Sequence, residues 1–215
     1  RILARRGGAP RRGIAGMIGV EDRDGLRIVT LRRPEKANSL TRAMLHDLEA
    51  AIAVPAQAVI LTGEGKVFSA GADLDEARAG LATDGVWDRL SARLAALPCL
   101  TIAALNGTLA GGAMGMVLAC DVRLAVPSAK FFYPVMKLGY LPQPADPARL
   151  RALIGPARTK ILLMAGARIE AAEALAWGLI DRIVEPDHLM AEAEALTADA
   201  RAAKAGHAAA IKGMI

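Results

Sequence analysis

Two short stretches of small residues constrain the fold of this chain more than any other feature. They are Phe68-Ser-Ala-Gly-Ala-Asp73 and Asn106-Gly-Thr-Leu-Ala-Gly-Gly112, and each connects an apolar segment to a helical pattern. Ala and Gly let the backbone approach a ligand closely. Paired backbone N–H groups at such a place stabilise the negative charge that develops on the carbonyl oxygen of an acyl thioester. The two stretches together therefore indicate an oxyanion hole.

The distribution of charge favours one folded core with a basic N-terminal arm. The 215 residues are 53% hydrophobic and carry a formal net charge of +5, and five arginines precede the first acidic residue, Glu21. Residues 17–215 are therefore neutral overall. We expect a flexible basic arm over 1–16, a core over 17–185 and a short helical segment over 186–215. With 3% aromatic residues the chain offers no base-stacking surface, so nucleic acid is not an expected partner.

The 24 residues from Leu97 to Cys120 carry no charge, which gives them the hydropathy of a membrane span. One proline and two glycine-containing pairs interrupt the segment, so a buried strand, a turn and a helix are the better interpretation. Cys99 and Cys120 lack the CxxC or His-rich spacing of a metal or redox site. We therefore expect buried free thiols, no metal, no membrane and a cytoplasmic location.

Hydrophobic periodicity predicts the order of the elements. Asp24-Gly25 predicts the turn of a β-hairpin, and Thr41 is a suitable N-cap for the helix that follows. Residues 149–184 are predicted to be helical with breaks at Gly155-Pro156 and Gly178, and 186–204 to form a last amphipathic helix. Between these ends the pattern predicts buried strands at 58–62, 100–105 and 122–125, helices at 86–94 and 114–119, and an apolar segment at 131–133.

The order of these elements and both small-residue stretches resemble the crotonase, or enoyl-CoA hydratase/isomerase, family over roughly residues 17–190. The motifs that carry the resemblance are Arg33-Pro-Glu-Lys-Ala-Asn-Ser-Leu40, Val67-Phe-Ser-Ala-Gly-Ala-Asp-Leu74, Asn106-Gly107 with Gly111-Gly112, and Cys120-Asp121. The resemblance implies an α/β, ClpP/crotonase-like spiral of strand-strand-helix repeats with a short helical C-terminal region. It also implies a homotrimer or a dimer of trimers, and lyase or isomerase activity in fatty acid metabolism.

The resemblance also implies which residues form the site. The oxyanion donors would be the backbone N–H groups of Ala72 and Gly112, the second near a helix N-terminus that favours negative charge. CoA would bind as part of the substrate, with no permanent cofactor. Lys36 would face the nucleotide end of CoA, although a solvated surface lysine is an equally good interpretation. The other residues implied to contact acyl-CoA are Ala37, Ala70, Asp73, Leu74, Pro134, Val135 and Leu138.

The sequence departs from the family pattern at both carboxylates that enoyl-CoA hydration needs. The resemblance implies one Glu where this chain has Gly115 and a second where it has Val135, and neither residue can transfer a proton. Candidates to replace them are Tyr140 as a proton donor and Asp146 as a base, with Asp75 and Glu76 as weaker alternatives.

Three hypotheses follow from this departure. The first is an acyl-CoA enzyme that needs an oxyanion hole but no carboxylate pair, such as a decarboxylase of malonyl-type thioesters. The second is a protein that binds acyl-CoA, or a partner protein, without turnover. The third is hydratase or isomerase activity that uses Asp146 as a relocated base. A dinucleotide-binding loop is not favoured, because neither stretch contains GxGxxG.

Overall fold

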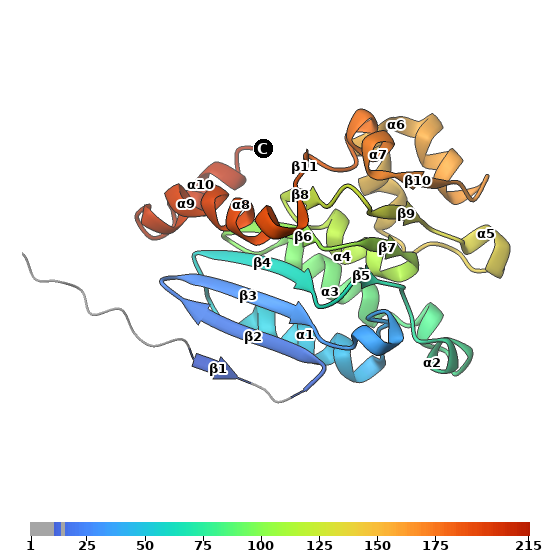
Figure 1. Cartoon of the computed structure of the whole chain (residues 1–215), viewed down its shortest axis with the longest axis horizontal. Helices are drawn as coiled ribbons and strands as arrows, with labels where there is room; N and C mark the ends of the chain where they lie inside the picture. Colours follow the sequence, from blue (N-terminus) through green and yellow to red (C-terminus); the bar gives the residue numbers. More distant parts are fainter. Residues whose placement is uncertain (1–10, 14–15) are drawn as a thin grey trace, which may run out of the picture.

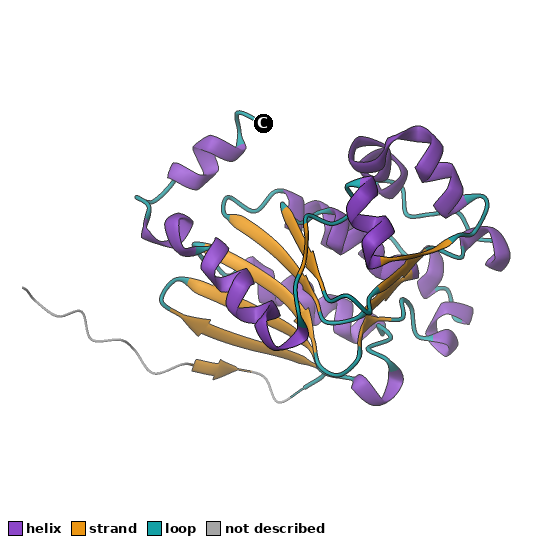
Figure 2. Ribbon diagram, turned by 45° about the horizontal axis from the view of Figure 1, so that its top comes forward, coloured by secondary structure: helices purple, strands orange, loops and turns teal. Residues whose placement is uncertain are grey.

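Two mixed β-sheets form the centre of the molecule (Figure 1). The computed structural model describes residues 11–13 and 16–215. The larger sheet has the strand order β1-β2-β3-β4-β6-β8-β11, and the smaller sheet has the order β10-β9-β7-β5. Figure 2 shows the two sheets as separate layers of strands with helices around them. This arrangement confirms the α/β class that the sequence predicts.

The larger sheet begins with the predicted hairpin. β2 (Ile18–Arg23) and β3 (Leu26–Leu31) pair antiparallel, and Asp24 and Gly25 between them both have positive φ, at 45° and 78°. Positive φ at both turn residues is typical of the tight turn that matches the strand twist. β3 then pairs in parallel with β4 (Ala58–Gly63), β4 with β6 (Leu100–Leu105), and β6 with β8 (Val122–Ala125).

Helices cover both faces of the larger sheet. α1 (Arg42–Ala53), α3 (Val86–Ala95) and α4 (Met114–Leu118) pack together behind it in Figure 1, and α8 (Leu189–Leu196) crosses β6 and β8 in front. The Thr41 hydroxyl accepts the Met44 N–H, which confirms the predicted N-cap of α1. Because both faces are covered, strands such as β4 are buried along nearly their whole length.

The smaller sheet carries the two small-residue stretches. It contains β5 (Val67–Ser69), β7 (Thr108–Ala110), β9 (Lys130–Phe132) and β10 (Arg168–Glu170). β5 pairs in parallel with β7, and β7 with β9. The helices α2 (Leu74–Arg78), α5 (Val135–Leu138), α6 (Asp146–Leu163) and α7 (Ala171–Trp177) lie on the side of this sheet in Figure 1. The two stretches therefore leave neighbouring strands of this sheet.

Two helical predictions need correction. The sequence predicts that residues 149–184 are helical with two breaks, but this range also contains two strands. β10 pairs antiparallel with β9, and β11 (Arg182–Ile183) pairs in parallel with β8. These short edge strands gain their hydrogen bonds from strands distant in sequence, which local periodicity cannot indicate. The predicted helix over 186–204 is divided into a 3-10 turn (Pro186–His188), α8 and α9 (Ala198–Ala202), and α10 (His207–Lys212) follows.

The N-terminal arm predicted over 1–16 lies mostly outside the described residues. Its described residues are 11–13 and 16, of which Arg11–Gly13 forms β1, and β1 pairs antiparallel with β2. In the part of the chain that the structure describes, no helix combines the length and apolar character that a bilayer crossing requires. The uncharged segment from Leu97 to Cys120 instead contains β6 and α4, as the sequence predicts, and also the short strand β7, which the sequence pattern does not predict.

Candidate active site

The two small-residue stretches touch each other through their backbones. Gly71 has a φ of +92°, and a Cβ placed on it would lie 2.9 Å from the carbonyl oxygen of Ala110 and 3.3 Å from the Cα of Gly111. Only glycine combines this positive φ with so close a contact. The parallel pairing of β5 with β7 brings the stretches to this point from positions about forty residues apart. The juxtaposition predicted from sequence is therefore present.

The backbone N–H of Ala72 points away from Leu40, the residue with which Ala72 forms a β-bridge. Leu40 and Ala72 form an isolated parallel bridge, in which the Leu40 N–H donates to Gly71 and the Asp73 N–H donates to Leu40. Both bonds of the bridge thus use residues 71 and 73. In a parallel bridge of this kind the N–H of the central residue points to the opposite edge. Ala72 and Gly112 line the same cavity.

The loop before α1 supports the first stretch. Asn38 is fully buried with a φ of +50°, and its side-chain amide donates to the carbonyl oxygens of Glu64 and Val67 at 2.9 and 2.8 Å. The backbone carbonyl oxygen of Asn38 accepts a hydrogen bond from the Ser69 hydroxyl at 2.8 Å. Buried polar groups that are fully hydrogen-bonded fix a loop in one conformation. Asn38 therefore positions the chain that leads to Ala72.

A cavity of about 260 Å³ opens beside the two stretches. It lies among residues from both stretches, α2, α3, the end of β9, α5 and the loop before α6. Most of the lining is apolar, and its polar side chains are those of Arg78, Tyr133, Tyr140 and Gln143. The sequence-predicted residues that line it are Ala70, Ala72, Leu74, Gly112, Pro134, Val135, Leu138 and Tyr140.

Three predicted residues stand outside this lining. Lys36 is exposed in a short 3-10 turn, and Ala37 follows it, accepting the Ala70 N–H at 3.0 Å through its carbonyl oxygen. Asp73 caps the N-terminus of α2 and pairs with Arg33 at 2.8 Å. That hydrogen bond from Arg33 holds the pKa of Asp73 below its ordinary value. Asp73 thus has structural partners, whereas Ala37 contacts the stretch at Ala70 and Lys36 precedes Ala37 in the chain.

The space beside Gly115 is filled by Asp146. A Cβ placed on Gly115 would lie 2.8 Å from the Oδ1 atom of Asp146, which begins α6 and is fully buried. The Tyr133 hydroxyl donates to Oδ2 of Asp146 at 3.0 Å and accepts the Gln143 N–H at 3.2 Å. Within the described residues no donor reaches Oδ1 of Asp146. A buried carboxyl group therefore stands next to the position at which the family resemblance implies a Glu side chain.

Burial controls the ionisation of this pair. It raises the pKa of Asp146 to about 6, against the lowering effects of the Tyr133 hydroxyl and Arg149, while Asp88 adds a further raising effect. Burial and the neighbouring Asp146 carboxyl also raise the pKa of Tyr133. Tyr133 therefore keeps its proton at neutral pH. The Asp146 carboxyl group loses its proton near pH 6, where it becomes negatively charged.

The remaining proton-transfer candidates lie in more exposed positions. The Tyr140 side chain is 37% exposed at the cavity. Asp75 pairs with Arg78 at 3.3 Å on the exposed face of α2, and Glu76 accepts the backbone N–H of Arg42 at 2.6 Å. Tyr133, Arg78, Trp87 and Gln143 line the cavity without having been selected from the sequence. The burial of Tyr133 on an apolar strand end, next to a proline, gave no sequence signal that distinguishes it from a core residue.

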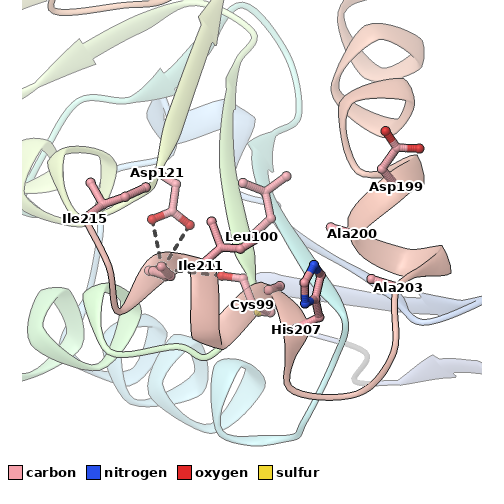
Figure 3. Close-up of a pocket in the computed structure, with 11 residues that line it drawn as sticks. Cys99, Leu100, Asp121, Asp199, Ala200, Ala203, His207, Ile211 and Ile215 are labelled. Carbon is pink, nitrogen blue, oxygen red and sulfur yellow. Dashed lines mark hydrogen bonds and ion pairs between the residues drawn. The ribbon is translucent and has the colours of Figure 1, made fainter.

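A second cavity of about 420 Å³ lies between the start of β6 and the C-terminal helices α9 and α10 (Figure 3). Its lining is mostly apolar, and the Asp121 carboxylate in it is already paired with Lys212 at 2.9 Å. Cys99 also lines it, and burial raises the pKa of this thiol. None of the predicted site residues borders this cavity. The smaller cavity is therefore the better candidate for an active site, because both small-residue stretches and several polar side chains line it.

Comparison with known proteins identifies the family. Residues 21–215 match the family described as Enoyl-CoA hydratase/isomerase. The "Short-chain-enoyl-CoA hydratase" of Clostridium acetobutylicum is 35% identical over 174 residues, which cover 76% of this chain and 67% of that protein. The "Probable enoyl-CoA hydratase echA8" of Mycobacterium leprae is 38% identical over 177 residues, covering 79% of this chain and 69% of the relative.

The solved structures agree with the sequence relatives. The crystal structure of an enoyl-CoA hydratase from Bacillus anthracis superposes with a TM-score of 0.85 at 32% identity, covering 92% of this chain and 81% of that one. The chain therefore belongs to the enoyl-CoA hydratase/isomerase, or crotonase, family.

Proposed function

We propose that this protein binds an acyl-CoA thioester in the cavity between the two small-residue stretches and polarises its carbonyl group. The backbone N–H groups of Ala72 and Gly112 would donate to the thioester oxygen. The observation that carries this proposal is the backbone contact between Gly71 and Ala110. This contact brings the neighbouring residues Ala72 and Gly112 to one cavity. Gly112 lies in the first turn of a helical segment, where N–H groups lack intrahelical partners.

The rest of the acyl-CoA would extend along residues that the family resemblance implies. The pantetheine arm would pass Ala70, Asp73 and Leu74, and the Lys36 ammonium with Ala37 would border the nucleotide end. The acyl group would lie against Pro134, Val135 and Leu138, which are part of the largely apolar lining. No permanently bound cofactor is needed for this binding mode.

The reaction that fits this site proceeds through an enolate of the thioester and not through hydration. Gly115 and Val135 leave the site without the two carboxylates that hold and activate water in the proposed family mechanism. Decarboxylation of a malonyl-type thioester needs neither of these carboxylates. The bond to the departing carboxylate breaks, carbon dioxide leaves, and the bond electrons form an enolate whose negative oxygen the two N–H groups stabilise. One proton donor then completes the reaction.

The test compares the wild type with Ala72→Pro and Gly112→Pro, each of which deletes one N–H donor. Acetoacetyl-CoA serves as the probe because its enolate absorbs in the near ultraviolet. We expect the wild type to stabilise the enolate, and each variant to lose about a hundredfold or more of this effect, as for deletion of one oxyanion donor. Circular dichroism and thermal melting check that the variants fold.

A panel of crotonyl-, butyryl- and malonyl-CoA then separates the reactions. Release of carbon dioxide from malonyl-CoA supports decarboxylation, and steady hydration of crotonyl-CoA would contradict the reaction proposed above. Binding of the panel without turnover would assign the protein to the non-catalytic class of acyl-CoA-binding proteins. If acetoacetyl-CoA neither raises the melting temperature nor shows enolate absorbance, the proposed acyl-CoA site is wrong.

A further inference from the structure

The strongest unexplained feature of the molecule is the buried Asp146. Its Oδ1 atom lies against Gly115 of α4 without a donor, although Asp146 is fully buried. A buried polar atom without a hydrogen bond is costly, by roughly 1–3 kcal/mol. Such a group needs an explanation in function or in strain. Among the described residues, the one side-chain hydrogen bond to Asp146 comes from the hydroxyl of Tyr133, which lines the candidate active site.

The protonation state of Asp146 decides which of the two groups donates the hydrogen bond between Asp146 and Tyr133. A phenol hydroxyl has one proton to donate and can accept through its oxygen. When Asp146 is a carboxylate, the single proton of Tyr133 is used in the bond to Oδ2, and the Gln143 N–H occupies the acceptor side. When Asp146 is protonated, its own O–H can donate to the Tyr133 oxygen. The proton of Tyr133 is then released to point toward the cavity.

We propose that Tyr133 is the residue that exchanges protons with the α-carbon of the bound thioester, and that Asp146 is the positioning residue that receives and returns those protons behind it. This inference rests on the proposed function, because it needs a thioester in the cavity. It replaces the direct role for Asp146, and the donor role of Tyr140, that the sequence suggests. Asp146 is separated from the cavity, whereas Tyr133 borders it.

The proton transfer balances in both directions. In enolisation, the α-carbon–hydrogen bond breaks and its proton moves to the Tyr133 oxygen, while the original Tyr133 proton moves to Oδ2 of Asp146. The electrons of the broken bond pass to the thioester oxygen, which Ala72 and Gly112 would stabilise. In protonation of an enolate, Tyr133 gives its proton to carbon and takes one from Asp146, which becomes a carboxylate. After decarboxylation, water supplies the proton that restores Asp146.

The surroundings of Asp146 set the pH at which it changes from donating a proton to Tyr133 to accepting one from it. The groups that face it are Tyr133 after β9, Arg149 on its own helix and Asp88 on α3, and α4 contributes only Gly115. Removal of an α-proton needs the carboxylate form of Asp146. Because the pKa of Asp146 is raised to about 6, the rate of removal should rise about tenfold per pH unit below pH 6 and level off above it.

The experiment follows deuterium incorporation at the α-carbon of butyryl-CoA in heavy water by mass spectrometry. We expect the wild type to show the pH profile above. Asp146→Asn, which keeps the size of the side chain, and Tyr133→Phe should each exchange 10²- to 10⁴-fold more slowly at pH 7.5. The inflection near pH 6 should be absent from the residual exchange of Asp146→Asn. Asp187→Asn, at an exposed position between β11 and α8, controls for the change in charge.

The outcomes separate this inference from the proposed function. The acetoacetyl-CoA enolate of the wild type reports on Ala72 and Gly112, whereas exchange at the α-carbon of butyryl-CoA reports on Tyr133 and Asp146. If the wild type forms this enolate but does not exchange butyryl-CoA, or if either variant exchanges with the wild-type rate and profile, the roles of Tyr133 and Asp146 are wrong. If the wild type does not form the enolate, the oxyanion site itself is wrong.

Discussion

At the scale of single residues, Asp146 is a carboxyl group in surroundings that disfavour its charge. Its ordinary pKa of 3.8 is raised to about 6, chiefly by burial. Between pH 4 and 6 the folded protein therefore holds this proton more tightly than the unfolded chain does. The free energy of unfolding must fall as the pH rises through this window, and the contribution is lost once the pH exceeds about 6.

Replacement of Asp146 by Asn should stabilise the protein at neutral pH. The pKa difference corresponds to about 3 kcal/mol, which is the upper size of the gain expected at pH 8. At pH 4 the wild type and Asp146→Asn should differ much less, because the carboxyl group is then neutral. Urea unfolding from pH 4 to 8 measures this difference, with Asp187→Asn as the control. A variant that is less stable than the wild type at pH 8 would contradict the prediction.

At the scale of elements, the approach of the two small-residue stretches depends on one backbone contact. β5 and β7 pair in parallel over few residues, and beyond them Gly71 lies against Ala110 and Gly111. Asn38 supports the same stretch from the loop before α1 through bonds to residues that flank and include β5. The approach of the two stretches is therefore held by a backbone contact and by the hydrogen bonds of Asn38.

Gly71→Ala should separate the two stretches. The new Cβ would meet the carbonyl oxygen of Ala110 at 2.9 Å, and the positive φ adds strain. We expect a loss of roughly 3 kcal/mol in the free energy of unfolding and loss of the acetoacetyl-CoA enolate signal. Gly80→Ala is the matched control, since Gly80 has a φ of +100° but no atom within 4 Å of its added Cβ.

The control isolates the cost of the positive φ alone. We expect Gly80→Ala to lose about 1–2 kcal/mol of stability and to keep the enolate signal. Equal losses of stability and signal in both variants would show that backbone strain, and not the contact with Ala110, explains the effect of Gly71→Ala.

At the scale of the whole molecule, several apolar side chains near the cavity are open to solvent. Leu74 is 70% and Leu141 87% exposed, and Met136 and Leu138 on α5 are more than half exposed. Single exposed apolar residues are ordinary, but a group of them around one opening is typical of a binding or association surface. Either the acyl-CoA or a neighbouring copy of the chain would cover this group.

We predict that the protein assembles as a homotrimer or a dimer of trimers, as the family resemblance implies. Light scattering coupled to size-exclusion chromatography should give a mass of three or six times 22.4 kDa. Closed assemblies of identical subunits remove apolar surface from water without leaving a free edge. A mass equal to a single chain, over a tenfold range of concentration, would rule the assembly out.

The sequence by itself determined the local elements and the family. The Asp24-Gly25 turn, the Thr41 cap and the buried strands depend on short-range hydrogen bonds and on periodicity, which neighbouring residues encode. The composition of the two small-residue stretches also predicted that they come together, and their backbones are in contact in the structure. The short strands β10 and β11 were missed, because their pairing partners lie far away along the chain.

The tertiary structure alone decided the environment of each candidate proton carrier. Tyr133 and Tyr140 are chemically identical in the sequence, but packing buries one against Asp146 and leaves the other at the surface. The packing of α6 against α4 likewise places the Asp146 carboxyl beside Gly115, 31 residues earlier in the chain. Burial and contact between distant residues set the pKa and the direction of a hydrogen bond, and no local pattern specifies either.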